Sequence, residues 1–126
     1  MIEIELDNRS DTAVPPGAEV VALCRDTLAA EGIETGELGV AFVGPDEMRA
    51  LKRDHLGIDE PTDVLSFPID GTDELPAGLP RQLGDVVLCP QVVGDNWRWP
   101  LVHGLLHLLG YDHGEEMERR EAALLA

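Results

Sequence analysis

The stretch from Pro100 to His113, P-L-V-H-G-L-L-H-L-L-G-Y-D-H, places three of the four histidines of the chain among leucine and valine residues. On an α-helix, residues four apart share a face and lie about 6 Å apart along the axis, so His103 and His107 project together. Gly110 follows where a helix commonly ends, because glycine adopts the left-handed conformation without steric cost. The chain can then turn back and present His113. The spacing therefore predicts a metal site on a central helix.

Three neutral imidazoles with an open fourth position are typical of a catalytic zinc site, in which the ion acidifies a water molecule. The spacing H-x-x-x-H-x-x-G-x-x-H resembles the metal run of the metzincin peptidases, which carry Glu directly after the first His as general base. Gly104 occupies that position here, so peptide hydrolysis is disfavoured. The alternative interpretation is a core helix whose histidines bond to backbone carbonyls, and three histidines at ligand spacing favour the metal site over it.

The overall charge of the chain restricts its partners. The 126 residues suit one domain spanning residues 1–126, and 9 Lys and Arg against 25 Asp and Glu give a net charge of −16. Such a surface repels nucleic acid at long range. An RNA-handling protein of this composition needs a locally positive cleft, concentrated salt, or a metal and a partner that offset the repulsion.

Cysteine usage and the N-terminal residues bear on the compartment. Cys24 and Cys89 form no C-x-x-C pair, which indicates a reducing compartment. The start, M-I-E-I-E-L-D, lacks the basic and apolar regions of a signal peptide. The apolar run from Leu101 to Leu109 is too short to span a bilayer. We expect a cytoplasmic protein without a membrane partner.

Hydrophobic periodicity predicts the elements in order. Apolar residues alternate with acidic ones over 2–7, which indicates a half-exposed strand. We expect a helix from Gly17 to about Gly32, a strand over 38–43, a helix opening at Pro45, strands over 61–68 and 82–89, a metal helix capped by Asn96, and a last helix from Glu115. The order β-α-β-α-β-β-α-α predicts an α+β fold: a small mixed four-stranded sheet with helices packed over it and the metal helix central.

Three stretches together resemble the YbeY family of bacterial endoribonucleases: P-T-D-V-L-S-F-P at 61–68, L-G-D-V-V-L-C-P at 83–90 and H-G-L-L-H-L-L-G-Y-D-H at 103–113. The resemblance covers most of the chain from Val40 onward. It implies a zincin-like α+β fold, a Zn²⁺ ion held by His103, His107 and His113, and metal-dependent cleavage of single-stranded RNA. It also implies a role in maturing the 3′ end of small-subunit ribosomal RNA and in ribosome quality control, with ribosomal RNA and small-subunit proteins as partners.

The chain departs from this family at two places. Many members carry an arginine six residues before the threonine of P-T-D-V, as a candidate phosphate contact, and Leu56 stands there. Arg53, or Lys52 or Arg49, could substitute from the same helix. The helical stretch before the histidine run is also shorter, only Gln91 to Val102, and this shortening would remove part of a substrate cleft.

Other polar residues have two interpretations each. Asp112 could accept a proton from the attacking water or satisfy a turn. Asp85 could accept an imidazole N–H or face solvent. Ser66, with Thr62 and Asp63, could bind substrate, although capping and turn roles explain the latter two equally well.

The remaining candidates are expected to be structural. His55 shares a helix face with Met48 and Leu51, as a core-edge residue would. Cys89 as a fourth zinc ligand has no support from spacing. Trp97 and Trp99 could stack on bases, but packing at the start of the metal helix is the favoured interpretation.

The resulting hypothesis is a zinc-dependent, single-strand-specific endoribonuclease acting on ribosomal RNA. One alternative is a zinc hydrolase of peptides or amides, which Gly104 disfavours. The other is a non-catalytic, zinc-stabilised ribosome assembly factor, which would bind metal and small subunits without turnover.

Overall fold

The computed structural model of the chain describes residues 2–56 and 62–126. Its elements follow the predicted order, with two short helices inserted before the metal helix. They are β1 (Ile2–Asn8), α1 (Gly17–Ala30), β2 (Gly36–Phe42), α2 (Pro45–Leu56), β3 (Val64–Pro68), β4 (Gln82–Leu88), α3 (Pro90–Val93), the 3-10 helix η1 (Gly94–Asn96), α4 (Arg98–Leu108) and α5 (Glu115–Leu124). Pro61, the first residue of P-T-D-V-L-S-F-P, lies outside the described residues.

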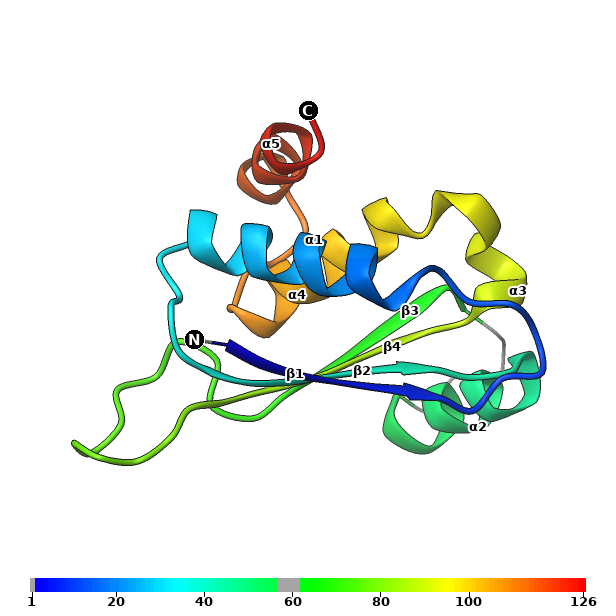
Figure 1. Ribbon diagram of the computed structural model, residues 1–126, viewed down its shortest axis with the longest axis horizontal. Helices are drawn as coiled ribbons and strands as arrows, with labels where there is room; N and C mark the ends of the chain where they lie inside the picture. Colours follow the sequence, from blue (N-terminus) through cyan, green and yellow to red (C-terminus); the bar gives the residue numbers. More distant parts are fainter. Residues whose placement is uncertain (1, 57–61) are drawn as a thin grey trace.

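The four strands form one mixed sheet in the order β1-β2-β4-β3. The pairs β1 with β2 and β2 with β4 are parallel, whereas β3 runs antiparallel to β4 at the other edge. Helices α1, α4 and α5 lie on one side of the sheet and α2 on the other (Figure 1). The predicted α+β fold with a small mixed sheet is confirmed, and so is the half-exposed first strand.

Side-chain alternation along β4 divides the buried residues between the two faces of the sheet. Val86 and Leu88 pack with Val20 of α1 and Leu101 of α4. Val87 points the other way and packs with residues of α2, β2 and β3. Helix α4 contacts β3 and β4 of the sheet and also α1 and α5. It therefore has the central position predicted for the metal helix.

The C-terminus of α4 has the predicted glycine stop. The N–H of Gly110 bonds to the carbonyl of His107, and the N–H of Tyr111 bonds to the carbonyl of Leu106, which is the pair of bonds of a Schellman motif. Gly110 has φ 97°, a conformation that strains any residue with a side chain. The turn sends the following loop back toward the helix that precedes it.

The N-terminus of α4 differs from the prediction. Trp97, not Asn96, holds the N-cap position, and no side-chain hydrogen bond caps the helix. Asn96 belongs to η1, which runs directly into α4 because Trp97 itself has a helical backbone conformation. The Trp97 side chain is buried in the main core, so packing takes the place of a polar cap. Pro100 sits in the first turn, as expected.

Gly104 lets α4 approach the sheet closely. A Cβ atom at this position would lie 2.7 Å from Cγ1 of Val86 and 3.1 Å from Cγ2 of Val64. The position after the first histidine therefore faces β3 and β4, and no side chain fits there. Among the described residues, no helix is long and apolar enough to cross a membrane.

Candidate metal site

The three predicted ligands converge at one place. The ring centroids of His103 and His107 lie 4.6 Å apart, and the His113 ring lies 5.1 Å from His103 and 4.6 Å from His107. One ligand atom from each ring lies within 4.8 Å of the others. Helix α4 supplies the first two rings from successive turns, and the loop after Gly110 returns the third.

The spacing of the nearest donor atoms fits a tetrahedral ion. Nε2 of His103 and Nε2 of His107 are 3.2 Å apart. Two nitrogens that each lie about 2.0–2.1 Å from one tetrahedral zinc are separated by about 3.3 Å. The first two rings are therefore already spaced as ligands of a single ion.

Hydrogen bonds at the other ring nitrogens decide which nitrogen carries the proton. Nδ1 of His107 lies 2.9 Å from the carbonyl oxygen of Tyr111, which can only accept, so this nitrogen donates. Nδ1 of His103 lies 2.7 Å from Oε1 of Glu121. In the neutral rings both Nε2 lone pairs then face each other, and they repel unless a cation lies between them. This donor set fits a metal ion.

The electrostatic surroundings keep His107 in its metal-binding form. Burial, and the neighbouring His103, lower the pKa of His107 below its ordinary value. A lowered pKa leaves the ring neutral at neutral pH, and the neutral ring is the form that coordinates metal.

A second group of contacts involves Tyr111, two residues before His113. The Tyr111 hydroxyl donates to Oε1 of Glu31 at 2.6 Å, and Nε of Arg120 donates to Oε2 of the same carboxylate at 3.0 Å. The hydrogen bond to Glu31 raises the pKa of Tyr111. The end of α1, the loop after α4 and helix α5 are thus linked through the Glu31 carboxylate.

The triad opens into a cleft of about 480 Å³ beside the β3 edge of the sheet. None of the described residues that line this cleft is lysine or arginine. The lining residues are Leu56, Thr62, Asp63, Val64, Leu65, Ser66, Pro68, Trp99 and the three histidines.

Two further predicted site residues lie close to the triad. Ser66 lines the cleft, but its hydroxyl donates to the carbonyl of Gly104 at 2.9 Å, so only its oxygen lone pairs remain for a substrate. Asp112 is exposed in the loop beside His113, and it acts electrostatically on His107. The roles proposed for these residues stay predictions.

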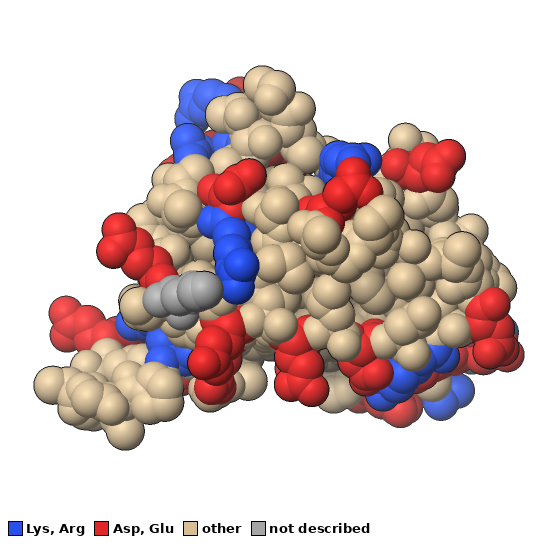
Figure 2. Space-filling model, viewed as in Figure 1, with Lys and Arg blue, Asp and Glu red and all other residues tan. Residues whose placement is uncertain are grey.

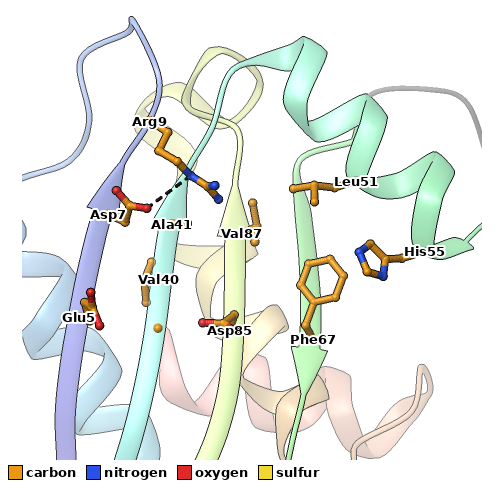
Figure 3. Close-up of a pocket in the computed structure, with 11 residues that line it drawn as sticks. Glu5, Asp7, Arg9, Val40, Ala41, Leu51, His55, Phe67, Asp85 and Val87 are labelled. Carbon is orange, nitrogen blue, oxygen red and sulfur yellow. Dashed lines mark ion pairs between the residues drawn. The ribbon is translucent and has the colours of Figure 1, made fainter.

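Asp85 and Arg53 lie away from the triad. Figure 3 shows Asp85 in a pocket on the α2 side of the sheet, with Glu5 and Phe67, and strand alternation explains this position because its neighbour Val86 faces α4. Of the two interpretations of Asp85, the exposed, solvent-facing one therefore agrees with the structure, and the imidazole acceptor does not. Arg53 is exposed on α2, pairs with Asp54 at 3.3 Å and is not among the described residues of the cleft. Leu56, which replaces the expected arginine, does line it.

Three of the four residues expected to be structural lie outside the cleft, and the fourth, Trp99, lines it. His55 contacts Phe67 edge-on in the α2-side pocket, with centroids 4.8 Å apart, and lies outside the triad. Cys89 is buried in the core cluster beneath α2 and is not part of the metal-binding group. Trp97 packs in the core as expected. Trp99 instead lines the cleft and stacks on the His103 ring, with centroids 4.8 Å apart.

Sequence reasoning missed Glu121, which contacts His103 from the last helix. Glu121 is buried, and it follows buried Met117 by four residues and precedes half-buried Leu124 by three. A charged residue within the apolar stripe of a helix was therefore the available signal, because such a residue needs a partner.

An α+β domain with a histidine triad at the edge of a mixed sheet, open to a cleft, defines the class of metal-dependent hydrolases. A model of the family described as endoribonuclease YbeY matches residues 6–125. Endoribonuclease YbeY of Halorhodospira halophila is 41% identical over 99% of this chain and 91% of its own length. The Salinispora tropica protein of the same name is 39% identical over 95% and 88%.

A solved structure agrees with these relatives. The solution structure of TM1509 from Thermotoga maritima is 27% identical, with a TM-score of 0.57 over 99% of this chain and 87% of that one. The chain belongs to the YbeY family of endoribonucleases, as the three sequence stretches predicted, and it is accordingly a hydrolase of the nuclease class.

Proposed function

We propose that this chain, as a single domain of residues 1–126, is a zinc-dependent endoribonuclease that cleaves single-stranded RNA in the cytoplasm. Its substrate would be the 3′ end of small-subunit ribosomal RNA, in maturation and quality control, with small-subunit proteins as partners. The observation that carries the proposal is the convergence of the Nε2 atoms of His103 and His107, 3.2 Å apart, in a cleft that also contains His113. Family membership supplies the reaction class.

The residues of the cleft would have different roles in the proposed reaction. His103, His107 and His113 would hold the ion. When bound, zinc supplies Lewis-acid chemistry, making water nucleophilic near neutral pH and drawing charge from a phosphate oxygen. Asp112, beside His113, is the candidate proton acceptor. Thr62 and the exposed part of Trp99 line the cleft where a nucleotide could bind or stack.

The position of Gly104 argues against peptide hydrolysis. A glutamate there would be the general base of a metzincin-type peptidase. The close contact with Val86 and Val64 leaves no room for it. In the proposed nuclease, Asp112 or the substrate itself would accept the proton instead.

The test uses metal content and RNA cleavage measured on the same preparations. We expect the wild type to bind about one equivalent of zinc through its three histidines and to cleave end-labelled single-stranded RNA but not duplex RNA. His107→Ala should lose both properties. His55→Ala is the matched control, because His55 lies outside the triad.

Two results would overturn the proposal. Equal zinc content in wild type and His107→Ala would remove the metal site. Lost zinc with unchanged RNA cleavage would show that the activity does not use this site.

A further inference from the structure

Glu121 is a buried carboxylate with both oxygens engaged. It is only 6% exposed, although it belongs to a helix whose other acidic residues are solvent-exposed. Oε1 lies 2.7 Å from Nδ1 of His103, and Oε2 accepts a hydrogen bond of 2.7 Å from Nε1 of Trp99. A buried charge is unfavourable unless such bonds compensate it, so the placement is specific to these two partners.

Glu121 and Trp99 together restrict the His103 ring in two directions. Glu121 fixes the ring by its Nδ1 edge, while Trp99 stacks on its face at an interplanar angle of 26°. Because the carboxylate can only accept, it keeps the proton on Nδ1. The remaining nitrogen, Nε2, is left as the donor that points at His107.

The other ligand from α4 is held differently. Nδ1 of His107 donates to a backbone carbonyl, which carries no full charge and which no substitution of a side chain removes. A carboxylate withdraws the Nδ1 proton more strongly and makes the opposite nitrogen a better metal donor. We therefore expect the metal affinity of the site to depend on the Glu121 side chain, whereas the partner of His107 belongs to the backbone.

We propose that Glu121 is the positioning residue of the metal site: from helix α5 it fixes the tautomer and orientation of His103 and holds Trp99 in the wall of the cleft. The inference rests on the proposed function, because it requires that the triad binds a metal ion. It assigns α5 a role in the chemistry of the site beyond covering the hydrophobic core.

The test measures zinc affinity by competition with a chromogenic chelator, for wild type, Glu121→Ala and Glu121→Gln. We expect Glu121→Ala to weaken zinc binding roughly 10- to 100-fold, the usual effect of removing a residue that orients a ligand. Glu121→Gln should fall between, because the amide keeps an acceptor for one of the two donors but not for both. Glu118→Gln is the control, since it removes the same charge from an exposed position on the same helix.

A merely structural role predicts a different set of results. The thermal stability of the metal-free proteins and the visible spectrum of their cobalt forms are therefore measured in parallel. A changed cobalt spectrum in Glu121→Gln, with unchanged metal-free stability, would support positioning. Unchanged zinc affinity and cobalt spectrum in a folded Glu121 variant would overturn the positioning role. If Glu121→Ala does not fold, the same comparison is made with Glu121→Gln.

The two proposals fail in distinguishable ways. If the wild type binds no metal, the proposed function and this inference both fall. If the wild type binds zinc and the Glu121 variants bind it equally well, only the role of Glu121 is removed.

Discussion

At Gly104 the backbone of α4 comes so close to β3 and β4 that a single added carbon collides with Val86 and Val64. Gly104 is the main difference between this chain and a metzincin-type peptidase. The close contact between α4 and the sheet depends on the same residue. The absence of glutamate at this position removes the general base of such a peptidase. The structure adds the steric reason for its absence.

Gly104→Ala should destabilise the fold. Overpacking a well-packed core typically costs about 1–3 kcal/mol, which exceeds the gain of up to about 1 kcal/mol from replacing a helical glycine by alanine. Urea unfolding measures the difference. The control is Gly17→Ala, also in a helix, where the added atom meets only the end of the flexible Leu6 side chain. Equal or greater stability of Gly104→Ala would contradict the close contact.

Cys24 should be unreactive in the folded protein. Burial raises the pKa of its thiol to about 12, so the thiol stays protonated and non-nucleophilic at about pH 8, where a free cysteine reacts readily. Cys89 is also buried. We expect a thiol reagent to modify neither cysteine in the native state and both after unfolding in urea. Rapid native labelling of Cys24 would show that the core around α1 opens.

Among the elements, α5 contributes more to the site than its terminal position suggests. Two of its residues reach the region behind the histidines: Glu121 contacts His103, and Arg120 contacts Glu31, which in turn accepts from Tyr111. Helix α5 also covers Val102 and Leu106 of α4 with Met117. The metal helix is therefore positioned by packing and by hydrogen bonds from the same element.

Tyr111→Phe should separate stability from metal binding. It removes the hydroxyl that donates to Glu31 but leaves the carbonyl that accepts from His107. We expect a loss of about 0.5–1.5 kcal/mol in the free energy of unfolding, the usual contribution of one hydrogen bond, with zinc affinity close to wild type. Urea unfolding and chelator competition measure the two quantities. A loss of affinity without a loss of stability would indicate that the hydroxyl positions the loop of His113.

For the whole molecule, the net charge of −16 remains the strongest constraint on an RNA substrate. Figure 2 shows acidic side chains spread along the sheet rim and the helices in view, with basic side chains interspersed. The described residues of the cleft include no lysine or arginine. The long-range field thus opposes the approach of RNA, unlike that of a basic RNA-binding protein.

The salt dependence of RNA binding should reflect this charge. Proteins that neutralise phosphates with lysine and arginine lose affinity steeply between about 50 and 200 mM salt. For this chain we expect affinity for single-stranded RNA to stay constant or rise over that range, because salt screens the repulsion. Fluorescence anisotropy of a labelled oligonucleotide, with zinc held constant, measures it. A steep loss of affinity with salt would reveal a basic contact surface outside the described cleft.

Some features of the fold could be predicted from the sequence and others could not. Local patterns decide the elements: alternation in β1, the glycine stop at Gly110 and the helical spacing of His103 and His107 all act over a few residues, and each appears as predicted. The start of α4 differs from the prediction of an Asn96 cap, because the buried side chain of Trp97 replaces a polar cap there.

The sequence by itself determined the element order, the family and the three candidate metal ligands, since periodicity, motif and spacing are properties of nearby residues. Only the tertiary structure decided which carboxylate serves the site. Asp85 lies on the far face because a strand alternates its side chains, and Glu121 reaches His103 from eighteen residues away because α5 folds back over α4. Such contacts depend on the packing of whole elements, which no local pattern encodes.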